Sequence, residues 1–179
     1  MSLLNVLPEC YVDTNLTEYL LGDMVNHQHS CTKVIASLKS VFGDKFVVGI
    51  IDNDDNSQEI NGGYVAECKV LATRGHLTLR KHPDNPHYLI TIAPAIDRFI
   101  VDCATETKVK TEDYGIPSDL KGFTQRAKSV QARNDKAFKG LFSAISGAQE
   151  INAMKATLKY LLANTYKADT SIIVTLFNQ

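Results

Sequence analysis

Acidic residues follow several apolar runs of this sequence. The ends of such runs are positions where catalytic or ligand-binding side chains often lie. Glu9 follows the first run, Asp52 and Asp54 close the strongest run, and Asp97 comes shortly after a third. If these runs are parallel strands, the carboxylates meet at one edge of the sheet, because ligands bind outside the carboxyl ends of such strands. Carboxylate oxygens are typical Mg²⁺ ligands. The pattern therefore predicts a site for a divalent cation that acts on a phosphate.

The acidic stretch DNDDN at 52–56 has a plainer alternative explanation. Asp and Asn favour turns because their side chains bond the local backbone, so a solvated turn after a buried strand is also consistent with it. A calcium loop of the EF-hand type is excluded, because Ser57 stands where the sixth loop position needs Gly and Gly63 where the twelfth needs Glu.

Three apolar runs are predicted to be the buried strands that position these acids, at 3–8, 45–52 and 87–94. The second is β-branched and apolar without alternation, as is typical of strands buried on both faces of a parallel sheet. A further short strand is predicted within 23–29.

Helices are predicted between these strands. Asp13 and Ser30 are the expected N-caps of the first two helices, and Gly22 and Gly43 their C-terminal stops. A third helix is predicted over 95–106, with its apolar residues on one face.

The rest of the chain is less regular in its pattern. The segment 62–75 favours a helix that ends at Gly75, and 77–83 favours an extended chain. A polar linker follows the third helix. Two helical stretches and a final apolar run come after the linker, at 123–145, 150–166 and 170–177.

The order of these elements predicts an α/β fold with a mostly parallel sheet flanked by helices. The chain has 179 residues, 44% of them hydrophobic, which suits one core with a small annex. We expect an α/β core at 1–104 and a mainly helical extension at 105–179 that packs on it.

The arrangement of the acids resembles the Toprim domain. There, a strand is followed by Glu, a helix opens with Asp, and a later apolar strand ends in Asp-x-Asp; the matching residues are Glu9 and Asp13 in PECYVD, and Asp52 and Asp54 in IIDNDDN. The resemblance covers roughly 1–100 and is shared by overcoming-lysogenization-defect nucleases and compact phage-defence proteins. By analogy with the latter, Asp97 would be an accessory acid near the metal.

The resemblance implies cleavage of phosphodiester bonds that depends on Mg²⁺, with Mn²⁺ as an alternative cation. Glu9 would be the catalytic acid/base and a metal ligand, and Asp52 and Asp54 would hold the metal with support from Asp13 and Asp97. The sequence departs from the Toprim pattern after Glu9, where Cys10 replaces the usual Gly. That departure leaves open an inactive Toprim-like module that binds a partner, and a receiver-type domain is a third, weaker alternative.

Five residues are candidates for contact with nucleic acid. His27 and His29 are spaced so that a strand would place both on one face, although an exposed turn is an alternative. Arg126, Lys128 and Arg133 form a partial basic stripe in a helix, which could follow a phosphate backbone or be a solvated face.

Composition excludes several other classes of protein. The net charge is −1, so any basic surface must be local. The chain has no apolar stretch long enough to span a bilayer and no signal-peptide pattern at its start, so we expect a cytoplasmic protein without a membrane partner. The four cysteines form no CxxC pair and are expected to pack as thiols. A homodimer or a protein partner stays open.

Overall fold

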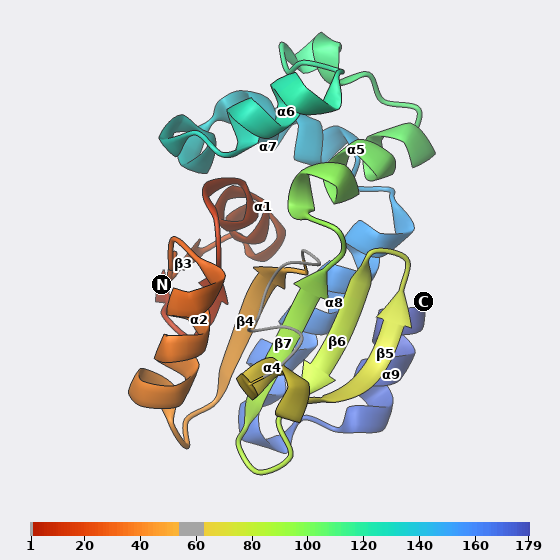
Figure 1. Cartoon of the computed structure of the whole chain (residues 1–179). Helices are drawn as coiled ribbons and strands as arrows, with labels where there is room; N and C mark the ends of the chain where they lie inside the picture. Colours follow the sequence, from red (N-terminus) through yellow and green to blue (C-terminus); the bar gives the residue numbers. More distant parts are fainter. Residues whose placement is uncertain (1, 54–62) are drawn as a thin grey trace.

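The structure is a computed structural model that describes residues 2–53 and 63–179. It is an α/β fold built on a mixed five-stranded sheet, which confirms the predicted α/β class (Figure 1). The sheet was expected to be mostly parallel, and among the described strands two of the four pairings are parallel. The strands run in the order β2 (Val6–Pro8), β4 (Val47–Asp52), β7 (His87–Ile92), β6 (Leu77–Lys81) and β5 (Lys69–Arg74).

The strands that carry the predicted acids are parallel. β2 pairs with β4, and β4 pairs with β7, both in parallel register, while β6 and β5 complete the sheet in antiparallel register. A small parallel pair joins β1 (Ser2–Leu3) to β3 (Met24–Val25). The chain after β3 continues beside β2, because the N–H groups of Asn26 and Gln28 donate to the carbonyls of Val6 and Pro8, each at 3.0 Å.

One face of the sheet is covered by α2 (Cys31–Ser37), the π-helix η1 (Leu38–Phe42) and α4 (Gly63–Glu67). β4 presents Val47 and Ile51 to this side, packed in one cluster with Val34 of α2. Gly49 lies between them, and a side chain there would collide with Leu89 and Val34, at 2.7 and 3.0 Å from an added Cβ. The glycine thus lets α2 lie close against the sheet.

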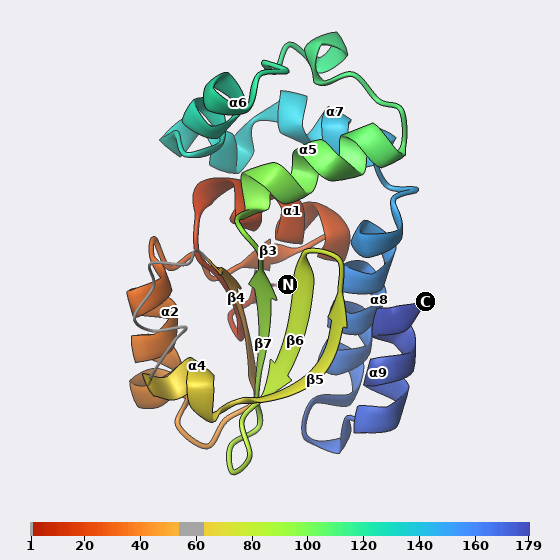
Figure 2. The same ribbon diagram turned by 45° about the vertical axis from the view of Figure 1, so that its right-hand side comes forward.

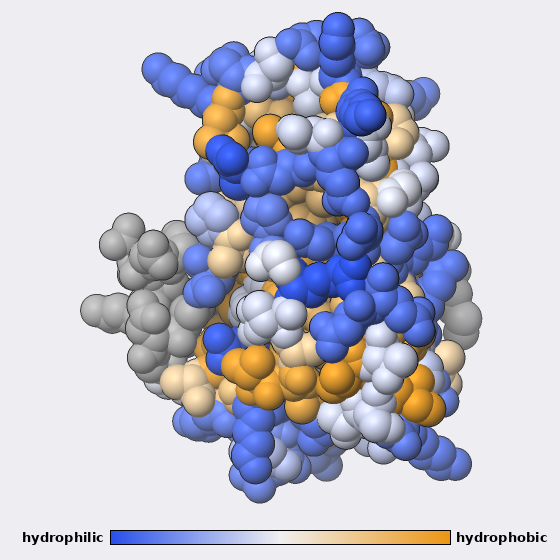
Figure 3. Space-filling view, turned by 90° about the vertical axis from the view of Figure 1, so that its right-hand side faces the viewer, coloured by the Kyte–Doolittle hydropathy of each residue, from blue (hydrophilic) through white to orange (hydrophobic). Residues whose placement is uncertain are grey.

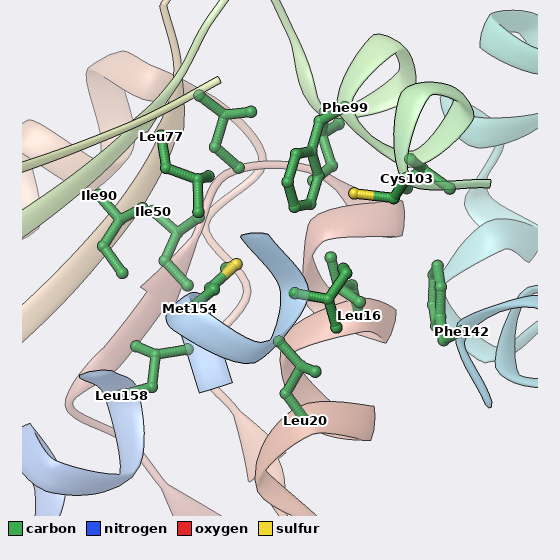
Figure 4. Packing of buried hydrophobic residues seen from close by; sticks show 14 of the residues in the cluster. Leu16, Leu20, Ile50, Leu77, Ile90, Phe99, Cys103, Phe142, Met154 and Leu158 are labelled. Atoms are coloured by element: carbon green, nitrogen blue, oxygen red, sulfur yellow. The ribbon is translucent and has the colours of Figure 1, made fainter. Parts of the chain in front are cut away.

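The other face packs against helices from both ends of the chain. Leu16 and Leu20 of α1 (Tyr11–Leu21) share one hydrophobic cluster with Ile50 of β4 and with Met154 and Leu158 of α8 (Figure 4). α8 spans Gln149–Asn164 and α9 spans Thr170–Asn178. The C-terminal helices are therefore part of the main core.

A helical layer lies beyond the carboxyl ends of β4 and β7 (Figures 1 and 2). It contains α5, α6 and α7, and the 3₁₀ turns η2 and η3 connect these helices. A further 3₁₀ turn, η4, follows α8. The bounds are α5 (Ile96–Glu106), η2 (Thr111–Tyr114), α6 (Leu120–Ala127), η3 (Val130–Asn134), α7 (Lys136–Ala144) and η4 (Thr165–Lys167). Among the described helices, none has the length and apolar character needed to cross a membrane.

The prediction of a helix over 62–75 was wrong for the second half of that segment. Only α4 is helical, and the chain is extended from Lys69 onward. The β-branched residues of this segment pair with β6 in a hairpin that turns at Gly75, whose φ of +52° suits glycine.

Two further local predictions need correction. Cys10 is the N-cap of α1, and Asp13 lies in its first turn. The stretch 123–145 is divided by η3, after which the side chain of Asp135 caps α7 by accepting from Ala137 N–H at 2.8 Å. The final apolar run, for which no element was predicted, forms α9, capped by Asp169.

Candidate functional site

A pocket of about 280 Å³ lies at the carboxyl ends of the parallel strands. Glu9 follows β2, Asp52 ends β4, and Asp97 lies in the first turn of α5, the helix that follows β7. The pocket is lined by Glu9, Cys10, Tyr11, Val12, His27, His29, Asp52, Ile96, Asp97, Ala127 and Lys128. The fold thus brings together acids that are far apart in the sequence.

Glu9 and Asp52 are joined directly across the neighbouring strands. The backbone N–H of Asp52 donates to Glu9 Oε2 at 3.0 Å. The backbone N–H of Glu9 in turn donates to the carbonyl of Ile50, also at 3.0 Å. The parallel register of β2 and β4 therefore sets the position of the Glu9 carboxylate.

Asp52 also holds the start of α5. Its Oδ1 accepts the backbone N–H of Ile96 at 2.9 Å, where the N-cap residue, Ala95, offers no side-chain acceptor. A carboxylate near a helix N-terminus is favoured by the helix dipole. Asp52 thus has a structural role in addition to any chemical one.

Asp13 lies beneath the pocket and is 1% exposed. Its Oδ2 accepts the backbone N–H of Cys10 at 3.0 Å. Its Oδ1 is buried and has no hydrogen-bond partner within the described residues. A buried carboxylate oxygen without a donor is costly, so this atom is a candidate for a ligand contact or a bound proton.

Asp97 connects α5 and α6, two helices of the helical layer beyond the sheet. It accepts a hydrogen bond from the Thr124 hydroxyl of α6, and its Oδ1 accepts the backbone N–H of Arg98 at 2.8 Å. The side chain is largely buried. This contact places α6, and Lys128 just after it, over the pocket.

The acids of the site destabilise each other's charged forms. Burial raises the pKa of Asp13 well above the usual range, and the charges of Glu9 and Asp97 raise it further. Burial likewise raises the pKa of Asp52, and the charges of Asp13 and Glu9 raise it further. A positive charge in the pocket would relieve this repulsion.

Nitrogen-bearing side chains form the other wall of the pocket. His27 and His29 both line it, in the stretch that follows β3, and Tyr11 stacks on His27 with ring centroids 4.7 Å apart. Burial, together with the charges of His29 and Arg133, lowers the pKa of His27 to about 4. Lys128 also lines the pocket.

The predicted basic stripe divides into different environments. Arg126 is bound to the protein itself, with its Nη2 2.7 Å from Asp135 Oδ2 and its Nη1 donating to the carbonyl of Gly115. Lys128 faces the pocket, and Arg133 is near enough to His27 to affect its titration. Arg126 is therefore a poor candidate for contact with nucleic acid, while the other two keep that role as a prediction.

The donor chemistry of the site suits a hard cation. The carboxylates supply oxygen ligands, the type that Mg²⁺ and Mn²⁺ favour, and Asp13 Oδ1 is a buried oxygen that lacks a donor among the described residues. Within residues 2–53 and 63–179, no three acidic, His or Cys side chains are grouped closely enough for a complete ligand set. Asp54, the second acid of the predicted Asp-x-Asp pair, lies outside the described residues.

Cys10 replaces the expected Gly next to Glu9 without disturbing these contacts. Its backbone N–H bonds Asp13, and its carbonyl accepts the hydroxyl of Thr14 at 2.7 Å. Burial raises the pKa of its thiol strongly, so a thiolate nucleophile is disfavoured.

Several residues of the site escaped sequence reasoning. Thr14 bonds His27, Tyr11 stacks on it, and Thr124 bonds Asp97. Asn15 is buried and holds η3 against α1 through two backbone carbonyls. These contacts join segments that are distant in the sequence, so no local pattern indicates them.

Comparison with known proteins adds no relative. The chain matches no family model, no curated protein and no solved structure.

Proposed function

We propose that the protein is a Mg²⁺-dependent phosphodiesterase of the nuclease type, similar in its site to Toprim domains. One observation carries the proposal: Glu9, Asp52 and Asp97 converge from three segments on a pocket whose other wall bears His29 and Lys128. Acids for a cation and nitrogen donors for a phosphate thus face the same space. A setting in bacterial defence against phage is an extension of this proposal, based on the sequence resemblance alone.

The residues divide into two roles. Glu9 is the proposed base that takes a proton from the attacking water, and Asp52 and Asp54 are the proposed metal ligands, supported by Asp13 and Asp97. A bound divalent ion would supply positive charge that stabilises the phosphate in the transition state.

Lys128 and Arg133, together with His29, are proposed to contact the phosphate backbone. Both ring nitrogens of His27 are bonded within the protein, so His27 is a poor candidate for this contact. Charge–phosphate contacts of this kind give affinity without sequence preference. The proposed substrate is therefore a nucleic acid whose sequence is not constrained by these residues.

Metal binding is tested by isothermal titration of Mg²⁺ and Mn²⁺ into the wild type and into Asp52→Ala combined with Asp54→Ala. We expect binding to the wild type that is lost in the double variant. Asp113→Ala is a matched control, because Asp113 is an exposed acid that does not line the pocket. Equal binding by all three proteins would contradict the site.

Catalysis is tested with Glu9→Gln on plasmid and single-stranded substrates. The amide oxygen of Gln can still accept the Asp52 N–H, so the fold should be kept, while the base is removed. Loss of general-base catalysis predicts a rate lower by at least about 100-fold. An unchanged rate would exclude Glu9 as the base.

A partner-binding module without catalysis is the second candidate, and a specific observation favours it. Glu9 and Asp52 both bond backbone N–H groups, as carboxylates with a purely structural role would do. The side of the molecule with β5 and α9 also shows an apolar band in its lower part (Figure 3). Failure to bind metal both alone and with an oligonucleotide present would favour this candidate.

A further inference from the structure

A chain of hydrogen bonds runs from α1 to the pocket through two histidines. Thr14 Oγ1 lies 2.8 Å from His27 Nδ1, and His27 Nε2 lies 3.0 Å from His29 Nδ1. The other ring nitrogen of His29 is Nε2, and His29 is an exposed residue of the pocket lining.

The direction of each hydrogen bond follows from counting protons. The Thr14 hydroxyl has a single hydrogen, which it donates to the carbonyl of Cys10 at 2.7 Å. His27 must therefore donate from Nδ1 to Thr14 Oγ1. When His27 is neutral its Nε2 is an acceptor, and His29 must donate to it from Nδ1.

The surroundings of His27 support this arrangement. Burial lowers the pKa of His27 to about 4, so the ring is neutral near pH 7. Tyr11 stacks on His27 and lies edge-on to His29, with centroids 4.7 and 6.0 Å apart. His29 itself has φ of +74°, a left-handed conformation that a residue other than glycine rarely adopts.

We propose that His29 is the general acid of the cleavage reaction, with His27 and Thr14 as positioning residues that fix its orientation. The inference rests on the proposed function and assigns a role within the same pocket. The general acid is the imidazolium form of His29, in which both ring nitrogens carry a proton. Neutral His27 accepts the Nδ1 proton, and the proton on Nε2 is the one that is transferred.

The step conserves atoms and charge. Water loses a proton to Glu9, and its oxygen forms a bond to phosphorus. The bond from phosphorus to the leaving oxygen breaks, and its electron pair stays on that oxygen. The leaving oxygen takes the proton from His29 Nε2, and both side chains then exchange protons with solvent.

The experiment compares two leaving groups in the wild type and in His29→Ala, with Mg²⁺ or Mn²⁺ present. The sugar alkoxide of an oligonucleotide needs a proton as it leaves, whereas the nitrophenolate of bis(p-nitrophenyl) phosphate does not. Loss of a general acid predicts a kcat at least about 100-fold lower on the oligonucleotide and little changed on the nitrophenyl ester. Added imidazole should restore part of the oligonucleotide cleavage.

The positioning residues give a second comparison. Thr14→Ser keeps the hydroxyl and should retain the wild-type ratio of the two rates, while Thr14→Val should shift the ratio in the direction of His29→Ala. An equal loss on both substrates in His29→Ala, or no loss, would overturn the role of His29 while leaving the nuclease proposal standing. No cleavage of either substrate by the wild type would overturn the proposed function and this role with it.

Discussion

The carboxylate of Glu9 and the backbone N–H of Asp52 are 3.0 Å apart, which ties the end of β2 to the end of β4. The Asp52 carboxylate continues the connection to Ile96 at the start of α5. The same groups that could hold a cation therefore also fix the edge of the sheet. Since Asp13 lies buried beside them, the charge of this site must affect the stability of the whole fold.

The stability of the metal-free protein should fall from pH 5 to pH 8. The pKa values of Asp13 and Asp52 are raised in the folded protein, mainly by burial. Folding thus favours the protonated forms of the two carboxyl groups. The stability that they contribute is present at low pH, and it is lost as the pH rises from the ordinary aspartate range through the raised pKa values. Denaturant unfolding measures the fall in the free energy of unfolding between pH 5 and pH 8. This fall should be smaller in Asp13→Asn than in the wild type, by more than about 1 kcal/mol.

Mg²⁺ provides the control for this pH effect. A cation that binds the folded state raises its stability in proportion to the logarithm of its concentration. At pH 8 it should raise the unfolding temperature of the wild type and have less effect on Asp52→Asn. A stability that is flat with pH and insensitive to Mg²⁺ in both proteins would show that the acids bear no significant mutual charge.

Much of the framework could be predicted from local sequence. The run that became β4 is apolar and β-branched, and Gly22 and Ser30 end and begin helices as expected. β5 was missed because its segment alternates weakly and is stabilised by pairing with β6, a tertiary effect. Glu9, Asp52 and Asp97 line one pocket at this edge of the sheet, because parallel strands bring their carboxyl ends together.

The opposite wall of the pocket could not be predicted in the same way. The contact of Thr14 with His27 depends on how the chain after β3 lies beside β2, and the sequence spacing carries no trace of it. The different environments of Arg126 and Arg133 depend on the break between α6 and η3, because Arg126 lies in α6 and Arg133 in η3. Helical periodicity alone places these two residues, seven positions apart, on one continuous face.

Arg126 and Lys128 should separate structural from binding effects. Arg126→Gln removes a partly buried ion pair with Asp135 and should reduce stability with little effect on oligonucleotide affinity. Lys128→Gln should leave stability unchanged and weaken oligonucleotide binding. The slope of log affinity against log salt concentration should become shallower by about one, the contribution of one phosphate contact. Fluorescence anisotropy at several salt concentrations measures both affinities, and the reverse assignment of effects would contradict the proposed path of the nucleic acid.

Asn15 should control the placement of the segment that carries Arg133. The side-chain amide of Asn15 is buried and donates to the carbonyls of Ala132 and Asp135 at 2.7 and 3.2 Å. Asn15→Ala leaves buried backbone acceptors without these donors, so we expect a loss of about 1–3 kcal/mol in the free energy of unfolding. Asn152→Ala, on the exposed side of α8, is the matched control and should change little.

The same variant tests whether η3 helps to bind the phosphate backbone. Release of η3 from α1 would leave the acids in place, because their contacts come from β2, β4 and α5. Asn15→Ala should therefore weaken oligonucleotide binding while Mg²⁺ affinity, measured by titration, stays near that of the wild type. A parallel loss of both affinities would mean that η3 supports the whole pocket, and an unchanged oligonucleotide affinity would remove Arg133 from the proposed interface.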